Sequence, residues 1–414
     1  MDKHKHVIFL GAGASKGSGY PLANELRLRM SSPGWINKLH DHKGLGGVSI
    51  QPLVEYLTQH ARILAFFRTG AFASLDEFCK LASATGEEGA FKNEIHNLRF
   101  VVRAVLGALN PELHFEDSEY YAFVQSLFEE NLVHLRDDLA VLTYNYDPYI
   151  EYLLWRAYEK RGEIAFTARD TSVLNAVTSG LYSPEKTDWL EADQIQSRFC
   201  LLKLHGSVCR PGTHIAQEFE LFFNSDSGAR MMKLIASCEE SVIPPVFFPW
   251  EVVANGGPAD DSRFPIPDPK VRNLARGIWE RARREVQRAA KISFVGLSMN
   301  PLLLEGLDYL FKGNGHKVEI VIANTDNKQF HTAAKDADWA AEPQSPAHVL
   351  NELLQRIAPN LKKYGKVNAA GDLKSDTFTL VADFGTFIRE EMSPFNFGAT
   401  FGRLIGSELG RAVR

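Results

Sequence analysis

The sequence predicts an α/β protein built on a doubly wound parallel sheet, with a helical insertion and a C-terminal extension. Three observations favour this fold. Short apolar runs recur along the chain and are typical of buried strands. The stretches between them space their apolar residues as helices do, which favours strand–helix alternation and a parallel sheet. Several runs also end in glycine or small polar residues. The runs cover residues 7–10, 139–143, 201–204, 292–295 and 318–322.

Length and charge narrow the class of protein. The chain has 414 residues, which at about 100–200 residues per domain predicts two or three structural units. Hydrophobic residues make up 45% of the chain, enough for a full core. The formal net charge is −5, so the sequence has no overall electrostatic footprint for direct binding to nucleic acid.

The four cysteines, Cys79, Cys200, Cys209 and Cys238, form no CxxC pair. A zinc ribbon needs two such pairs, so we expect no structural metal, and so few thiols are typical of a reducing compartment. Only a short apolar run follows the N-terminus, and no run approaches the length of a membrane span. We therefore expect a cytoplasmic protein that does not bind membranes.

The chain divides into a main α/β domain and an extension. We assign residues 1–330 to the domain, with a helical insertion at about 50–135, and residues 331–414 to the extension. The extension is predicted to serve oligomerisation or partner docking.

Several single elements complete this outline. Helices are expected from Pro148 and over residues 271–286, where one apolar stripe faces an arginine-rich side. Residues 219–223 are expected to form an edge strand, and residues 377–381 a further strand.

The first apolar run leads into a glycine loop. A glycine-rich loop before a helix N-terminus lets the backbone approach an anionic group, which favours phosphate. The third glycine of the usual dinucleotide fingerprint is missing, because Lys16 stands in its place. Taken alone, the loop is equally well explained as a chain reversal. Its residues are Gly11, Ala12, Gly13, Ala14 and Ser15.

The second strand ends in Thr143-Tyr144-Asn145-Tyr146-Asp147. Asn145 is suited to hold a ribose hydroxyl or a water molecule. Asp147 has a structural alternative, since Asp is strongly preferred as a helix N-cap and a helix is expected directly afterwards.

The third strand ends in Lys203-Leu204-His205-Gly206-Ser207. A histidine can act as a general base near neutral pH, and the glycine leaves space beside its ring. The alternative is an ordinary packed histidine. Two later strand ends carry Ser298, and Asn324 with Asp326, which are suited to bind a nucleoside, although turn chemistry explains such residues equally well.

The motifs GAGAS, SGYP, TYNYD, KLHGS, VGLS and IANTD occur in this order between residues 11 and 326. Together they resemble the sirtuin-like NAD-binding family, specifically its bacterial branch found in antiphage defence. The resemblance covers roughly residues 7–327. It implies a Rossmann-like sheet with a helical insertion, and motifs that line one NAD pocket.

The resemblance also implies roles for the motif residues. Asn145, His205 and Asp147 would be catalytic, with His205 as the base, Asn145 positioning water or a ribose hydroxyl, and Asp147 orienting the pocket or capping its helix. The remaining positions would bind NAD: Gly11, Ala12, Gly13, Ala14, Ser15, Thr143, Gly206, Ser298, Asn324 and Asp326. Sirtuin deacylases usually carry a four-cysteine zinc ribbon, from which this chain departs.

The function implied by the resemblance is hydrolysis of NAD to ADP-ribose and nicotinamide once infection activates the protein. NAD would then be a substrate rather than a retained cofactor. The implied partners are further copies of the chain and a separately encoded hexameric translocase-type ATPase or Argonaute-like protein. An NAD-dependent protein deacylase and a non-catalytic sensor of NAD or ADP-ribose are the alternatives. The sequence leaves open the trigger, the partner and the number of copies.

Overall fold

A computed structural model describes the sheet, the helices around it and the segments that follow its strands. The described stretches are residues 5–31, 98–107, 118–129, 135–160, 200–209, 269–297, 319–323, 379–381 and 384–392. Single positions and short pieces between them complete the description: 61, 64, 65, 68, 75, 219, 222, 223, 246, 253, 254, 257, 258, 306, 307 and 309–311.

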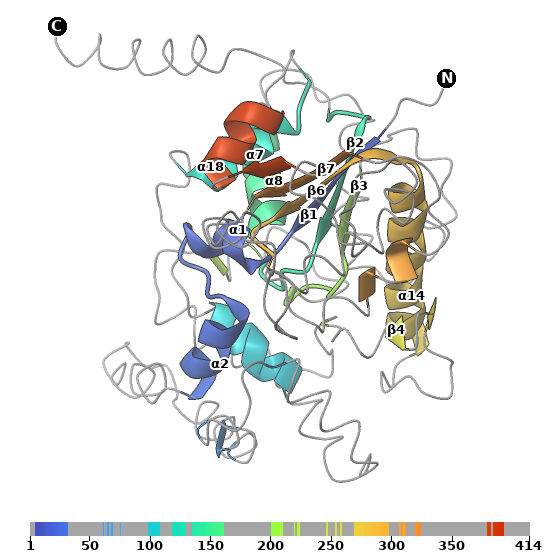
Figure 1. Ribbon diagram of the computed structural model, residues 1–414. Coiled ribbons are helices and arrows are strands. Elements are labelled where there is room, and N and C mark those ends of the chain that lie inside the picture. Colours follow the sequence, from blue (N-terminus) through green and yellow to red (C-terminus); the bar gives the residue numbers. More distant parts are fainter. Residues whose placement is uncertain are drawn as a thin grey trace, which may run out of the picture.

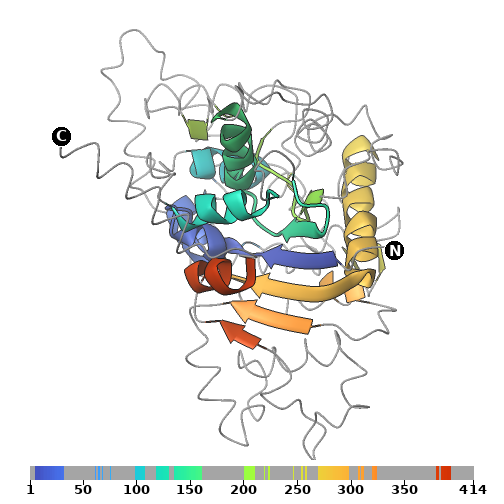
Figure 2. The ribbon, with the colours of Figure 1, turned by 90° about the horizontal axis from the view of Figure 1, so that it is seen from above.

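Six parallel strands form the central sheet, which confirms the predicted fold class. Figure 2 shows the arrows of β1, β6, β7 and β8 pointing the same way. The strand order is β3-β2-β1-β6-β7-β8. The strands are β1 (Lys5–Leu10), β2 (Leu139–Thr143), β3 (Cys200–Lys203), β6 (Ala289–Val295), β7 (Glu319–Ala323) and β8 (Thr379–Val381).

This strand order places a topological switch point in the middle of the sheet. From β1 the chain moves outward to β2 and β3, and then returns to the other side of β1 with β6 before continuing to β7 and β8. Numbered within the sheet, this is the 3-2-1-4-5-6 arrangement of dinucleotide-binding folds. Ligands of such sheets bind beyond the carboxyl ends of the strands at the switch point, which here lies between β1 and β6.

Helices lie on both sides of the sheet (Figure 1). The long helix α14 (Pro269–Gln287) lies on one side, whereas α7 (Glu119–Ser126), α8 (Tyr149–Lys160), α18 (Phe384–Phe387) and the π-helix η5 (Ile388–Met392) lie on the other. The remaining named elements are α1 (Ala12–Lys16), α2 (Ala23–Ser31) and the small antiparallel pair β4 (Val253–Ala254) and β5 (Gly257–Pro258).

The strands are buried because both faces of the sheet are covered. Every residue of β2 is buried, and on β1 the ring of Phe9 stacks on Phe294 of β6 at a centroid distance of 5.0 Å. Strands buried on both faces read as continuous apolar runs rather than alternating ones. This explains why the apolar runs of the sequence located the strands.

Three further sequence predictions are confirmed and one is refined. The helix expected from Pro148 is α8, and the stripe over residues 271–286 lies on α14. The strand expected at residues 377–381 is β8. The segment Gly11–Ser15 is expected as a loop from the sequence. In the structure Gly11 is the N-cap of the short helix α1, and the other four residues of the segment belong to that helix.

The prediction of an edge strand at residues 219–223 is wrong at the described positions. Phe219, Phe222 and Phe223 have helical backbone conformation. Their spacing of three and four residues places them on one face of a helix. That face packs on α8, where Phe223 stacks on Tyr152 at 3.9 Å and Phe219 meets the same ring edge-on at 5.7 Å.

The insertion and the extension are described in part. Within the insertion, residues 98–107 and α7 are helical. Within the extension, β8 joins the central sheet beside β7, and α18 with η5 follows it. Part of the extension therefore completes the sheet itself, and its role in oligomerisation or docking stays a prediction. In the described part of the chain, no helix is both long and apolar enough to cross a membrane.

Candidate functional site

The carboxyl ends of four strands lie level at one edge of the sheet. Leu10 at the end of β1 pairs with Thr143 of β2 on one side and with Val295 of β6 on the other. Thr143 pairs in turn with Lys203 at the end of β3. The motifs that follow these strands therefore start side by side, at the switch-point edge of the sheet.

Glycines allow the backbone after β1 to touch the backbone after β6. A Cβ atom at Gly13 would lie 2.7 Å from the Gly296 carbonyl oxygen, and one at Gly296 would lie 2.3 Å from the Ala14 nitrogen. Gly296 also has φ +61°, a conformation that side chains disfavour. Close packing of the two strand ends thus explains the glycines without a ligand.

Three backbone donors of the glycine segment are engaged within the protein. The Gly11 N–H donates to Val295 O at 2.9 Å, the Gly13 N–H to Gly296 O at 2.8 Å, and the Ala14 N–H to Gly11 O at 3.0 Å. A phosphate at this segment would have to use other donors or displace these bonds. Phosphate binding by Gly11–Ser15, including Ala12, stays a prediction.

Asn145 connects the end of β2 to the glycine segment. Its Nδ2 donates to Gly11 O at 3.1 Å and to Ser15 Oγ at 3.2 Å, while its backbone N–H donates to Thr143 Oγ1 at 3.1 Å. The side chain is 6% exposed, and its Oδ1 is buried without a hydrogen-bond partner among the described residues. An unpaired buried acceptor of this kind requires an explanation, and a ligand is one.

Asp147 has the capping role that the sequence left open. Its Oδ1 accepts the N–H of Tyr149, the first residue of α8, at 3.1 Å. Its Oδ2 accepts the Ser15 hydroxyl at 3.3 Å, so that Asn145, Ser15 and Asp147 form one chain of contacts. Burial raises the pKa of Asp147 to about 6; Lys203 acts in the opposite direction, and the Glu151 carboxylate adds to the rise.

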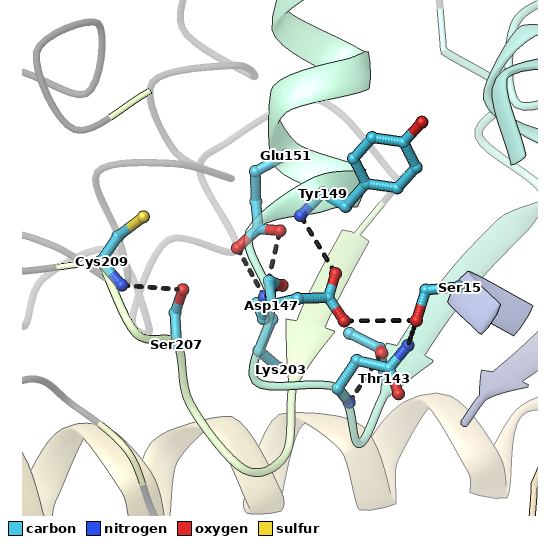
Figure 3. Close-up of polar contacts among 9 residues, drawn as sticks. Ser15, Thr143, Asp147, Tyr149, Glu151, Lys203, Ser207 and Cys209 are labelled. Carbon is cyan, nitrogen blue, oxygen red and sulfur yellow. Dashed lines mark hydrogen bonds and ion pairs between the residues drawn. The ribbon is translucent and has the colours of Figure 1, made fainter. Parts of the chain in front are cut away.

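A buried ion pair lies behind Asp147 (Figure 3). The Lys203 ammonium lies 2.8 Å from Glu151 Oε1 and also donates to the Asp147 carbonyl oxygen. Both side chains are fully buried. The pair fixes the backbone of Asp147 to the end of β3, because an unpaired charge at this depth would be strongly unfavourable.

A tight turn places His205 after β3. The Gly206 N–H donates to Lys203 O at 2.9 Å, and Gly206 takes φ +70°, which glycine adopts readily. The His205 ring contacts two tyrosine rings, meeting that of Tyr144 edge-on at 4.9 Å and stacking on that of Tyr146 at 5.4 Å. Both tyrosines flank Asn145 in the sequence, so the end of β2 forms the walls around the histidine.

His205 is a neutral base with one free nitrogen. Burial lowers the pKa of His205 to about 3, although a hydrogen bond with the Tyr144 backbone raises it somewhat. The ring is therefore uncharged at neutral pH. Its Nε2 is buried and has no hydrogen-bond partner within the part of the chain that the structure describes. This nitrogen can accept a proton or a hydrogen bond from a ligand.

The structure thus brings most predicted residues to one edge of the sheet. A chain of hydrogen bonds links Thr143, Asn145, Ser15 and Asp147 in that order. His205 follows the neighbouring strand and has no direct contact with these four among the described interactions. Three predicted positions lie outside the described residues: Ser298, Asn324 and Asp326.

Sequence reasoning missed several neighbours of this site. Lys203 was quoted only as part of its motif, yet a lysine inside an apolar strand signals a buried partner. Glu151 lies one helical turn after Asp147 and supplies that partner. Tyr144 and Tyr146 are visible in the motif as aromatic residues on either side of Asn145. Tyr120 of α7 carried no local signal at all.

No protein-family model matches the chain, and no curated protein matches its sequence.

Proposed function

We propose that the chain is an NAD⁺ glycohydrolase that cleaves NAD⁺ to ADP-ribose and nicotinamide. One observation carries the proposal. Asn145 and His205 follow adjacent strands at the switch-point edge, and each keeps a buried acceptor atom with no partner among the described residues. The strand order supports a dinucleotide at this edge, and the motif resemblance supports hydrolysis of that dinucleotide.

In this reaction the bond between the ribose C1′ and the nicotinamide nitrogen breaks, and nicotinamide leaves as a neutral molecule. Water adds to C1′ and loses one proton. Charge develops on the ribose in an oxocarbenium-like transition state, so the site has to orient the sugar and the water rather than protonate the leaving group. Neither a metal nor a redox group is part of this proposed step.

The residues divide this work between them. Asn145 orients the water or a ribose hydroxyl through its unpaired Oδ1, while its amide nitrogen is held by Gly11 O and Ser15 Oγ. His205, neutral because of its burial, accepts the proton at Nε2. Asp147 keeps Ser15 and the first turn of α8 in place and does not meet the reacting atoms.

The wider role proposed for this activity is bacterial antiphage defence by depletion of NAD in the cytoplasm. It rests on the motif resemblance. An enzyme of this kind has to be inactive until infection, because unregulated loss of NAD would kill the cell. Activation by self-assembly, or by a partner such as a hexameric translocase-type ATPase or an Argonaute-like protein, fits this requirement, with residues 331–414 as the proposed docking region.

The test is NAD⁺ turnover by the purified chain, alone and with a candidate activating partner, and total NAD in bacteria that produce the chain, before and after phage infection. Asn145→Ala and His205→Ala are expected to lower turnover by about 100-fold or more, the usual contribution of a positioned acid–base group. Gly17→Ala is the matched control, since a Cβ atom there meets nothing within 4 Å.

Three outcomes would contradict the proposal. Both variants turning over NAD⁺ as fast as the wild type would remove Asn145 and His205 from the chemistry. Release of O-acetyl-ADP-ribose from an acetylated peptide would indicate a deacylase. Tight NAD⁺ binding with no product under any trigger, infection included, would indicate a sensor.

A further inference from the structure

The helical insertion contributes a buried tyrosine to the site. Tyr120 lies on α7 and is 1% exposed. Its ring packs at 5.4 Å from Tyr149 of α8, at 5.6 Å from Phe384 of α18 and at 6.2 Å from Phe123 one turn further along α7. These three contacts fix the ring, and with it the direction of the hydroxyl.

The hydroxyl of Tyr120 belongs to the same group of side chains as Asn145. Burial, followed by the nearby Asp147 and Glu151 carboxylates, raises the pKa of the Tyr120 phenol well above its ordinary value, and a contact with the Asn145 amide acts in the opposite direction. The phenol therefore remains protonated and is a permanent donor. Yet the oxygen is buried and makes no well-formed hydrogen bond to any described residue.

Packing alone does not account for this hydroxyl. Phe123 and Phe384 fill the same aromatic cluster without a polar atom. Burying a hydroxyl without a partner is unfavourable, so a phenylalanine at position 120 would serve the cluster better. The Tyr120 hydroxyl, a donor, and Asn145 Oδ1, an acceptor, are thus two buried polar atoms on neighbouring side chains. Neither atom has a well-formed hydrogen bond to a described residue.

We propose that Tyr120 and Asn145 together bind one hydroxyl group of the reacting system, with the phenol donating to it and Asn145 Oδ1 accepting from it. A hydroxyl is a donor and an acceptor at once, so it satisfies both atoms. Two sources have this chemistry, namely a ribose hydroxyl of the dinucleotide and the water that attacks it. The assignment rests on the proposed function and makes the insertion part of the active site.

The test compares Tyr120→Phe with Tyr121→Phe, its partly buried neighbour on α7. Tyr120→Phe keeps the ring and loses only the hydroxyl. If the bound group is a ribose hydroxyl, the affinity for ADP-ribose in calorimetry falls by about tenfold or more. If it is the attacking water, that affinity is unchanged and kcat for NAD⁺ falls by about the same factor. Tyr121→Phe changes neither quantity.

A second variant pair tests whether the two side chains hold the same group. In the Asn145→Ala background, Tyr120→Phe is expected to add less than about a twofold effect, because the shared hydroxyl is already lost. Full additivity overturns the inference, as does a Tyr120→Phe chain that equals the wild type in both affinity and kcat.

The inference and the proposed function fail in different ways. A wild type that binds ADP-ribose but hydrolyses no NAD⁺ even in infected cells overturns the hydrolase alone, and the affinity of Tyr120→Phe then decides the role of the tyrosine. A wild type that does neither overturns both. Thermal unfolding of each variant without ligand shows whether an effect comes from misfolding.

Discussion

Two buried histidines lie at opposite ends of the same sheet and differ in their hydrogen bonding. His6 is at the start of β1, and His205 follows the end of β3. Burial is the main reason that the pKa of each is lowered to about 3. His6 Nε2 lies 2.7 Å from Ser293 Oγ, whereas His205 Nε2 has no partner among the described residues. The lowered pKa of a histidine therefore indicates only that its ring is buried. The unpaired Nε2 of His205 is the observation that indicates a functional role.

The charges around the two histidines differ as well. Near His6 the ion pairs are partly exposed: Lys291 binds Glu319 of β7 and Glu391 of η5, and Arg136 binds Asp138. At the other end, Lys203 and Glu151 are completely buried. At the amino-terminal edge of the sheet, partly exposed ion pairs connect η5 to the strands, and water screens their charges. At the carboxyl edge, the ion pair next to the site is fully buried.

The largest predicted effect separates the two histidines by activity. His205→Asn is expected to lower kcat for NAD⁺ by about 100-fold or more, because the proton acceptor is lost. His6→Asn is expected to stay within about twofold of the wild type, since His6 is remote from the carboxyl edge. Steady-state kinetics on both variants measures this. Equal losses of activity would mean that burial, rather than the free nitrogen, matters at both positions.

The next effect concerns backbone packing at the carboxyl edge. Gly296→Ala is expected to destabilise the fold by about 3 kcal/mol or more, because its Cβ would lie 2.3 Å from the Ala14 nitrogen at a positive φ. Gly17→Ala, with open space around it, should stay within about 1 kcal/mol. Chemical denaturation measures both. A tolerated Gly296→Ala would show that the two strand ends can separate, leaving the glycines open to a phosphate role.

The sequence was enough to predict the strands of the sheet and the strand ends that carry Asn145 and His205, for a physical reason. Strands buried on both faces are continuous apolar runs, and the carboxyl ends of parallel strands share one edge, so Asn145 and His205 could be placed near each other without coordinates. Contacts across long chain separations leave no such pattern. Tyr120 reaches Asn145 only because α7 packs on α8, and Lys203 meets Glu151 only through the register of β2 with β3.

Errors arose where one pattern fits two structures. The apolar residues at positions 219, 222 and 223 satisfy a short edge strand and one face of a helix, and only the packing against Tyr152 distinguishes the two. The glycine segment was expected as a loop, because two glycines in three residues disfavour a helix. Its contact with Gly296 outweighs that preference.

The ion pairs at the two ends predict a difference of similar size. Lys203→Met leaves Glu151 charged in the interior and is expected to lower the free energy of unfolding by about 3–5 kcal/mol. Lys291→Met removes partly exposed pairs and should lower it by about 1 kcal/mol or less. Denaturant titrations of both variants compare them. A similar loss in the two would show that water screens the Lys203 pair despite its burial.

The smallest effect is one in which the two histidines should behave alike. Between about pH 6 and pH 4 the unfolded chain protonates both, with an ordinary pKa of 6.5, while the folded chain keeps them neutral. Each therefore lowers stability by about 1.4 kcal/mol per pH unit as the pH falls. Asp147 acts oppositely, because its pKa is raised to about 6, so the folded chain takes up a proton first and gains stability as the pH falls.

His205→Asn and His6→Asn should each flatten the dependence of unfolding free energy on pH by about 1.4 kcal/mol per unit, whereas Asp147→Asn should steepen it by about the same amount. Denaturation at pH 4, 5 and 6 provides the slopes. If only His6→Asn flattens the curve, His205 is protonated in the folded chain, and it cannot be the proton acceptor in that state. If both flatten it equally while only His205→Asn abolishes turnover, burial and function are separated at the two ends of one sheet.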